Sequence, residues 1–153
     1  MTTSPTHGRL ARPADFDSIQ PLIERFYREE DYAEIDQPRA MTALRTLLAS
    51  PELGSVWLAE RDGVAIGYAV ICYGFSLEHR GRDAFLDEFF VEKFMRGQGI
   101  GNALLDAAEA SAIAAGVGVL HLEVERNNER AAALYVRRGY RGNARSLLSK
   151  KLS

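Results

Sequence analysis

The sequence predicts an α+β fold, a single domain with a central mixed, mostly antiparallel sheet and helices on both faces. Three observations predict it. Apolar residues follow helical spacing in the first third of the chain, β-branched and aromatic segments fill the middle, and a βαβα order with a closing strand ends it. The 153 residues, 46% apolar and 26% charged, suit one globular domain over residues 1–153, in which residues 1–7 are expected to be flexible.

The first third of the chain predicts a short strand and two helices. Residues 8–12 suit the strand, and apolar side chains between residues 16 and 26 recur at the intervals of a helix. A second helix is predicted over residues 39–49, because helical spacing continues there and Pro51 closes the segment. Helical elements therefore precede most of the sheet.

The middle of the chain predicts three consecutive antiparallel strands. Residues 55–60 and 65–75 are rich in β-branched and aromatic side chains, and a short turn containing Gly63 joins them, which is typical of a hairpin. A third strand is predicted over residues 84–91, after a polar loop. Cys72 lies in the apolar run of the second strand, where a core position is favoured over the role of a catalytic nucleophile.

The last third predicts a helix, a strand, a second helix and a closing strand. After a glycine-rich segment the apolar period returns to about 3.6 residues, which predicts an amphipathic helix. Residues 119–124 suit a strand, after which Asn127 or Asn128 is expected to cap a helix that Gly139 terminates. A final strand is predicted over residues 146–152.

Composition and charge exclude several classes of protein. The formal net charge of -2 gives no general attraction to nucleic acid. No apolar run approaches the roughly 20 residues of a membrane span, and residues 1–7 are too polar and short for a secretory signal. His7, His79 and His121 are scattered, so no metal site is expected. We expect a cytoplasmic protein with a small-molecule partner, and neither nucleic-acid nor membrane binding.

A glycine-rich turn directly precedes the predicted amphipathic helix. Alternate glycines gather backbone N–H groups around one point, and the helix N-terminus adds partial positive charge, so the turn is suited to phosphate. A Walker loop is excluded because Gly101 is followed by Asn102 and Ala103, and the dinucleotide fingerprint fails because its third small residue would fall on Asn102. A tight helix-entry turn without a ligand is the alternative. The turn consists of Arg96, Gly97, Gln98, Gly99, Ile100 and Gly101.

Three motifs follow one another in a specific order. They are Leu86-Asp87-Glu88-Phe89-Phe90-Val91, then Arg96-x-x-Gly99-x-Gly101, then Asn128-x-x-Ala131-x-x-x-Tyr135 with Gly139-Tyr140. Together they resemble the signature of the GNAT family of N-acetyltransferases, and the resemblance covers residues 84–140. Within that family, residues 86–101 and 128–139 look most like the diamine and thialysine acetyltransferases.

The resemblance implies acetyl-coenzyme A (acetyl-CoA) as the cofactor, held in a splayed cleft between neighbouring strands. Residues 96–101 and Asn102 are then expected to hold the pyrophosphate, Asn128 to help fix the cofactor, and Tyr135 to be the general acid near its sulfur. Asn128 as a mere helix cap and Tyr135 as a half-buried aromatic residue are the alternatives. The backbone groups expected to pair with the pantetheine arm belong to Phe89, Phe90 and Val91.

Acetylation of an amine needs a base as well as an acid. An alkyl ammonium is neutral in only about one molecule in a thousand near pH 7.4, and generating the nucleophile costs roughly 4 kcal/mol. The candidate bases are Asp87 and Glu88, acting directly or through water. Asp87 is favoured because it stands where the diamine acetyltransferases have glutamate. Since adjacent strand residues face opposite ways, only one of the two is expected to reach the cleft.

An acidic segment over residues 29–36 concentrates five carboxylates where this family forms its acceptor site. Glu30, Tyr32 and Asp87 are therefore candidate acceptor-binding residues, and a solvated charged loop is the alternative. We expect direct transfer of an acetyl group to a primary amine of a small cationic acceptor. A protein lysine or N-terminal acetyltransferase and a non-catalytic CoA-binding module are the alternatives. Family analogy also predicts a homodimer.

Overall fold

The structure is a computed structural model that describes residues 6–153. The predicted flexibility of residues 1–7 falls mostly on residues 1–5, which lie outside the described part. Contacts within the chain define two compact units, one ending at Leu122 and the other spanning Glu123–Ser153.

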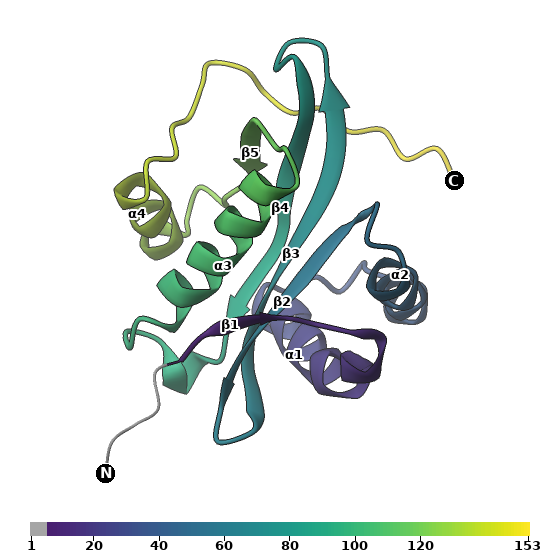
Figure 1. Cartoon of the computed structure of the whole chain (residues 1–153), viewed down its shortest axis with the longest axis vertical. Helices are drawn as coiled ribbons and strands as arrows, with labels where there is room; N and C mark the ends of the chain where they lie inside the picture. Colours follow the sequence, from purple (N-terminus) through teal and green to yellow (C-terminus); the bar gives the residue numbers. More distant parts are fainter. Residues whose placement is uncertain (1–5) are drawn as a thin grey trace. The chain divides into compact units, whose positions relative to one another are not determined.

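The first unit is built on a mixed sheet, which in residues 6–122 has five strands in the order β1-β2-β3-β4-β5 (Figure 1). Neighbours from β1 to β4 are antiparallel, and β4 pairs with β5 in parallel. The predicted mixed, mostly antiparallel sheet is therefore confirmed. The strands are β1 (Gly8–Leu10), β2 (Gly54–Arg61), β3 (Val64–Ser76), β4 (Gly81–Val91) and β5 (Val119–Leu122).

Helices cover both faces of this sheet, as predicted. α1 (Phe16–Glu29) and α2 (Gln37–Ala49) pack on one face, and α3 (Ile100–Ala114) packs on the other (Figure 1). The helical spacing explains the packing, because Ile19 and Leu22 of α1 are fully buried against the sheet, as is Leu104 of α3. Each face of the sheet thus has its own apolar core.

The β2-β3 hairpin has the glycine-containing turn that its sequence predicts, and the turn is two residues long. Asp62 and Gly63 both have positive φ, 52° and 76°, as a turn matched to the strand twist requires. Glycine adopts this conformation without steric cost, and aspartate tolerates it better than most residues. The turn sets the register of the pairs next to it, and an irregularity between Ala59 and Glu60 shifts the pairing of the rest of the two strands.

A β-bulge interrupts the pairing of β4 with β3. Glu88 lies opposite Val70, and Leu86 lies opposite Ile71, so Asp87 is an additional residue in β4 without a partner in the register. A bulge bends its strand and redirects side chains. Side chains therefore do not alternate strictly between the two faces of the sheet at Asp87. The expectation that only one of the two carboxylates reaches the cleft depends on that alternation.

The parallel ladder between β4 and β5 is short. It comprises four pairs, from Asp83 opposite Val119 to Leu86 opposite Leu122. β4 continues beyond this ladder to Val91 and turns through a 3-10 helix, Lys93–Met95, into α3. The end of β4 that precedes the glycine turn thus extends past the last β5 pair, as a splayed arrangement of these strands requires.

The second unit contains α4 (Glu129–Arg137). Asn128 caps this helix through its side-chain oxygen, which accepts a hydrogen bond from the Ala131 N–H at 3.1 Å. Gly139 follows the helix with φ of 96°, the left-handed conformation that ends many helices. Both end signals are confirmed, and Asn128 rather than Asn127 is the cap.

The predicted closing strand over residues 146–152 is wrong, because residues 140–153 contain neither helix nor strand. Leu147 and Leu148 are adjacent, so they cannot share one face of a strand, and they are 65% and 90% exposed. A strand also needs a neighbour for its backbone hydrogen bonds. Apolar residues alone were therefore an insufficient signal for this element.

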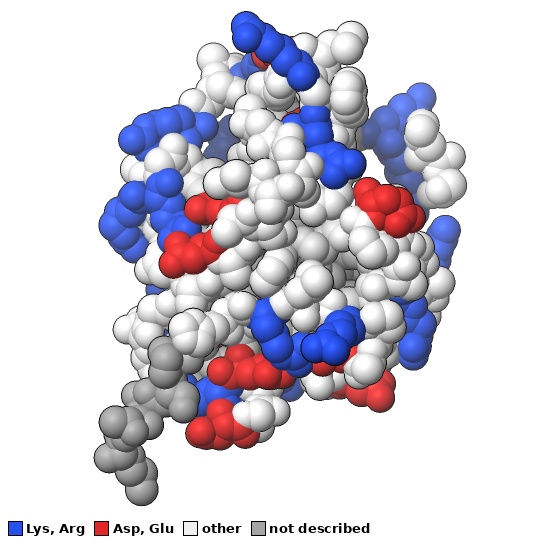
Figure 2. Space-filling model, viewed as in Figure 1, with Lys and Arg blue, Asp and Glu red and all other residues white. Residues whose placement is uncertain are grey.

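Charged side chains of both signs lie on the surface of the protein. On the face drawn in Figure 2, acidic and basic side chains are interspersed rather than gathered into one basic surface. Among the helices of residues 6–153, none has the length and apolar character that crossing a bilayer requires. Across the same described residues, no three histidine, cysteine or acidic side chains gather as potential metal ligands.

Candidate active site

The glycine turn forms an open cradle at the start of α3. Gly97 and Gly99 have φ of 77° and 81°, and Gly99 is the N-cap, where no side chain caps the helix. The first backbone bond of the helix runs from the Ala103 N–H to the Gly99 carbonyl at 3.1 Å, so earlier N–H groups point out of the helix end. A Cβ added at either glycine would meet nothing within 4 Å. The space above the turn can therefore admit a phosphate group.

Arg96 is held beside this turn by α1 and β4. Its NH2 group lies 2.6 Å from a carboxylate oxygen of Glu29, and its Nε donates to the Val91 carbonyl at 2.9 Å. The guanidinium carbon also lies 5.6 Å from the centre of the Phe90 ring. Arg96 thus fixes the turn to α1, and its predicted contact with pyrophosphate stays a prediction.

A second arginine contacts the turn from β2. Arg61 NH1 donates to Gln98 Oε1 at 2.7 Å, and Gln98 lies between the two glycines with positive φ. Sequence reasoning missed Arg61 because it ends a hairpin strand far from the turn in sequence. No local pattern marks that contact.

Glu88 lies in β4 before the strand reaches the glycine turn, and it packs against the aromatic core under α1. Its carboxylate accepts hydrogen bonds from the Tyr27 hydroxyl at 2.6 Å and from the Tyr68 hydroxyl at 2.9 Å. Both tyrosines are buried, at 7% and 0% exposure. Burial raises the pKa of Glu88, although the two phenol hydrogen bonds oppose that rise. Each carboxylate oxygen of Glu88 therefore already accepts a hydrogen bond from a phenol hydroxyl.

The Glu88→Gln variant is expected to be more stable than the wild type at about pH 7.5. Because the pKa of Glu88 is raised in the folded state, folding favours its protonated form, and this contribution to stability is lost as pH rises through the folded pKa. The amide oxygen of glutamine can accept from one phenol and its NH2 group can donate to the other phenol oxygen, so a neutral side chain avoids that loss. The thermal midpoint should rise by a few degrees, corresponding to ~1 kcal/mol. The exposed control Glu52→Gln should leave it unchanged, and a lowered midpoint for Glu88→Gln would contradict the expectation.

Asp87 shares the neighbourhood of Glu88, although Asp87 is exposed at the surface. Surrounding protein atoms still displace enough water to raise the pKa of its carboxyl. The charges of Asp87 and Glu88 both act on Tyr27, Tyr68 and Cys72. The bulge therefore places two carboxylates in one electrostatic environment.

Cys72 lies in this neighbourhood as an unreactive thiol. It is half-buried and packs against the core under α1. Burial, reinforced by the charges of Asp87 and Glu88, raises the pKa of Cys72 to about 11. Almost no thiolate exists near neutral pH, so the core position expected for Cys72 agrees with its environment.

The segment after α1 brings an aromatic ring next to these groups. The ring of Tyr32 lies 5.7 Å from that of Phe26 and 6.0 Å from that of Tyr27, the residue that donates to Glu88. Glu30 is half-buried where α1 ends. Of the five carboxylates in residues 29–36, Glu29 pairs with Arg96 and Asp36 caps α2 by accepting the Arg39 N–H at 3.1 Å. Glu30, Asp31 and Glu34 are the other three.

Asn128 and Tyr135, the remaining predicted site residues, belong to the second unit. Tyr135 is 8% exposed, and its ring centre lies 5.7 Å from that of Tyr140. Burial raises the pKa of Tyr135 to about 12, so its hydroxyl is protonated near neutral pH. Within the first unit, by contrast, the structure brings Asp87, Glu88 and Tyr32 into one neighbourhood.

Two glycines with positive φ at the start of α3, a short parallel ladder between β4 and β5, and carboxylates at a strand bulge together fit a CoA-dependent N-acetyltransferase. The family model described as the acetyltransferase (GNAT) family matches residues 16–140. The chain belongs to this family. It is an acetyl-CoA-dependent N-acetyltransferase, and the predicted enzyme class and cofactor are confirmed.

Two relatives support the same assignment. The chain is similar to the uncharacterized N-acetyltransferase YhfO of Bacillus subtilis, at 33% identity over 132 residues that cover 86% of this chain and 87% of the relative. It is also similar to an aminoalkylphosphonate N-acetyltransferase of Salmonella typhimurium, at 30% identity over 133 residues that cover 87% and 83% of the two chains.

Solved structures share the fold. The integron cassette protein HFX_CASS3, from the mobile metagenome of Cole Harbour Salt Marsh, has a TM-score of 0.85 and 32% identity, with coverage of 96% of this chain and 91% of that chain. A predicted acetyltransferase with acetyl-CoA from Clostridium acetobutylicum has a TM-score of 0.81, 20% identity and coverage of 95% and 96%. The predicted fold class is therefore confirmed.

The glycine turn fits the phosphates of acetyl-CoA, and Gly99→Ala tests that fit. The added Cβ would occupy the cradle and would strain a backbone with φ of 81°. The dissociation constant of CoA, measured by calorimetry, should rise by about 10- to 100-fold, equivalent to ~1.4 to 2.8 kcal/mol. The matched control is Gly63→Ala in the β2-β3 turn, where φ is 76° and nothing lies within 4 Å. Equal losses of CoA affinity in both variants would contradict the assignment.

Proposed function

We propose that the protein transfers an acetyl group from acetyl-CoA directly to a primary amine of a small cationic acceptor. Asp87 serves as general base and Tyr135 as general acid, while residues 96–101 and Asn102 hold the pyrophosphate. The bulge at Asp87, beside the acidic and aromatic neighbourhood of Glu88, is the observation that carries this proposal. Direct transfer is favoured because the thiol of Cys72 is too weakly acidic to serve as a nucleophile.

Asp87 is preferred over Glu88 as the base for a geometric reason. Both oxygens of Glu88 accept hydrogen bonds from buried phenols, which lowers their capacity to take a proton. Asp87 is exposed, and its raised pKa makes it a stronger base than an ordinary aspartate. Glu88 then acts as a fixed negative charge that favours an ammonium group nearby, and water can bridge Asp87 to the amine.

Tyr135 supports the departing thiolate by donating a hydrogen bond. With a pKa of about 12, its phenol is a weaker acid than the departing thiol, whose pKa is near 8.5, by about 3.5 units. Complete proton transfer would therefore cost about 5 kcal/mol before cofactor contacts are counted. Tyr135 therefore acts through a hydrogen bond that strengthens as sulfur gains charge, and the departed thiolate takes its proton from solvent.

The proposed acceptor is small and cationic because acidic groups lie near its expected position. The charges of Asp87 and Glu88 act on Tyr27, whose ring lies 6.0 Å from that of Tyr32, and Glu30 is the C-cap of α1. The resemblance to diamine and thialysine acetyltransferases points the same way. An aminoalkylphosphonate is the second candidate, because a relative at 30% identity is named for that acceptor.

Three further properties are part of the proposal. A small-molecule acceptor is preferred over a protein lysine or an N-terminal amine. The chain acts as a single N-acetyltransferase domain over residues 1–153, in the cytoplasm. It forms a homodimer, for which the free ends of the strand order at β1 and β5 offer sheet edges. Sedimentation analysis tests the last property, and a monomer at micromolar concentration would contradict it.

A screen of acceptors tests the proposed function. Polyamines, aminoglycosides, amino acids, aminoalkylphosphonates and lysine peptides are each incubated with acetyl-CoA, and release of the CoA thiol is followed. Preference for polyamines or related cationic amines is the expected result. A preference for aminoalkylphosphonates would select the second candidate, and a preference for peptides would reject a small acceptor.

A further inference from the structure

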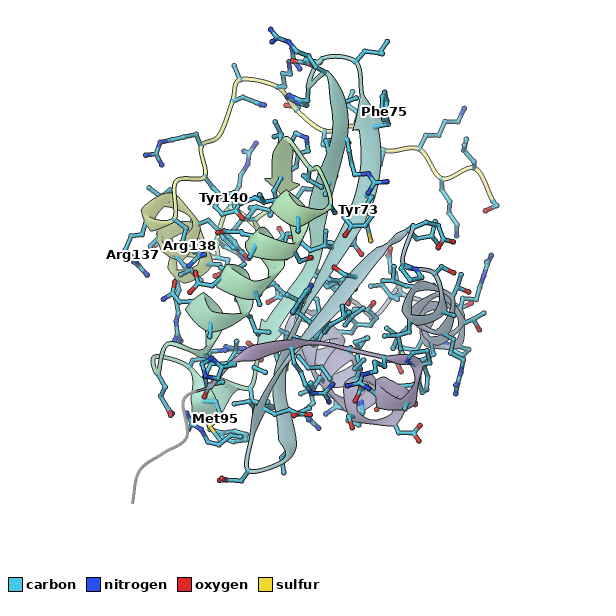
Figure 3. All side chains as sticks on the ribbon, in the orientation of Figure 1. Tyr73, Phe75, Met95, Arg137, Arg138 and Tyr140 are labelled. Carbon is cyan, nitrogen blue, oxygen red and sulfur yellow. The ribbon has the colours of Figure 1, made fainter. Side chains whose placement is uncertain are left out.

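Arg61 is a half-buried cation directly beside the glycine turn. It ends β2, and its NH1 group donates to Gln98 Oε1 at 2.7 Å and approaches Met95 Sδ at 3.5 Å. Figure 3 places Met95 at the end of the sheet where α3 begins, away from Tyr73 and Phe75 on β3. The guanidinium of Arg61 therefore lies at the cradle end of the first unit.

Arg61 differs from the other arginines of this region in its partners. Arg9 pairs with Asp15 and Glu60, and Arg25 and Arg96 each pair with a carboxylate of a neighbouring element. Over residues 6–153, no carboxylate forms a salt bridge with Arg61. Its positive charge is therefore not neutralised by an ion pair within the described chain.

The Nε atom of Arg61 is a second difference between this arginine and the others. Nε is buried and has no hydrogen-bond partner among the described residues. A buried N–H group without an acceptor costs folding free energy and calls for an explanation, of which a bound ion is one. An anion within reach of this guanidinium would supply the acceptor and the opposite charge together.

The glycine turn supplies backbone N–H donors at the start of α3, which complement such an anion. Gln98, whose side-chain oxygen accepts the Arg61 hydrogen bond, is the residue between Gly97 and Gly99, so the guanidinium is held by the side chain of a turn residue. Arg96, the cation expected from sequence to serve the phosphates, is instead paired with Glu29. Arg61 is therefore the arginine at the turn whose charge is available to a ligand.

We infer that Arg61 binds the pyrophosphate of acetyl-CoA. When the cofactor binds, the guanidinium exchanges its hydrogen bond to Gln98 for hydrogen bonds to phosphate oxygens. The planar donor fork of arginine suits two phosphate oxygens at once. Gln98 holds the side chain near the cradle before the cofactor arrives. The inference goes beyond the proposed function, which gives Arg61 no role.

Calorimetry with three ligands tests this inference on the whole chain. CoA carries the pyrophosphate and the 3′-phosphate, dephospho-CoA carries the pyrophosphate alone, and pantetheine carries neither. Arg61→Gln should weaken CoA and dephospho-CoA alike, by about 10- to 100-fold, because charged hydrogen bonds are lost. Pantetheine binding should be unchanged. Arg61→Lys should recover part of the loss, since it restores the charge without the fork.

A matched control removes the same charge elsewhere. Arg82 donates from β4 to the Ala115 carbonyl at 3.2 Å, and Arg82→Gln should leave the affinity of all three ligands unchanged. Without ligand, Arg61→Gln should change the thermal midpoint little, because the lost hydrogen bond to Gln98 is offset by removal of an unpaired buried N–H. The stabilisation of the variant by CoA should be smaller than that of the wild type.

Three results would overturn the inference. A loss confined to CoA would assign Arg61 to the 3′-phosphate, an equal loss with pantetheine would show a structural role, and an unchanged affinity for CoA would remove Arg61 from the site. None of these measurements needs an acceptor amine. The acceptor proposal can therefore fail in the amine screen while the Arg61 inference stands, and the reverse holds as well.

Discussion

Replacing Asp87 with asparagine is expected to lower kcat/KM by about 10²–10⁴-fold while CoA affinity stays unchanged. Asparagine keeps the size of the side chain at the bulge but cannot accept the ammonium proton. The wild-type pH profile should fall on its acidic side at a pH above the ordinary aspartate value of 3.8, because burial raises the pKa of Asp87. Initial rates of thiol release with saturating acetyl-CoA measure the effect.

The acceptor itself provides a sharper test of Asp87. A fluorinated analogue of the same amine has a lower ammonium pKa, so less help from a base is needed. The loss caused by Asp87→Asn should therefore shrink with the fluorinated acceptor. Glu88→Gln is the comparison variant and should cost less than about 10-fold, because a fixed charge rather than the base is removed. Equal losses with both acceptors would show that Asp87 is not the base.

The second large effect is expected at Tyr135. Tyr135→Phe should lower kcat by about 10²–10⁴-fold, because the hydrogen bond to the departing thiolate is lost while the buried ring is kept. Single-turnover measurements with saturating acetyl-CoA isolate the chemical step. The dissociation constant of acetyl-CoA should change little, which separates a role in the transition state from a role in binding.

Tyr140→Phe is the matched control for Tyr135. It removes a second phenol hydroxyl from the same unit, where the two ring centres lie 5.7 Å apart. Its turnover should remain within a few-fold of the wild type. Similar losses in both variants would indicate that the tyrosine pair supports the packing around α4, and unchanged turnover in Tyr135→Phe would remove Tyr135 from the mechanism.

Local sequence signals predicted most of the fold because the same residues that give the signals make the local structure. The turn at Gly63, the cap at Asn128 and the terminator at Gly139 each act within a few residues of the chain. Helical spacing predicted the buried side of α1 for the same reason. The closing strand over residues 146–152 failed because its existence depends on a distant partner, on which its own leucines give no information.

In the candidate site, too, features set by nearby residues could be predicted, and features set by distant parts of the chain could not. Motif order predicted the glycine turn and the carboxylates of β4, but not the bulge, which results from register with β3. The phenols that hold Glu88 were also missed. Tyr27 continues the apolar spacing of α1, and Tyr68 lies in an apolar run, so both read as core residues. Buried tyrosine hydroxyls usually need a partner, and that rule offered a signal for finding them.

The environment of Cys72 has a practical consequence for the bench. A pKa of about 11 instead of the ordinary 9.0 reduces the reactive thiolate fraction near pH 7.5 by about a hundredfold. Aromatic disulfide reagents, which turn yellow on meeting a thiolate, should therefore react quickly with liberated CoA and slowly with the enzyme. Continuous colorimetric assays of every variant should have a low protein background, and purified samples should resist cross-linking by air.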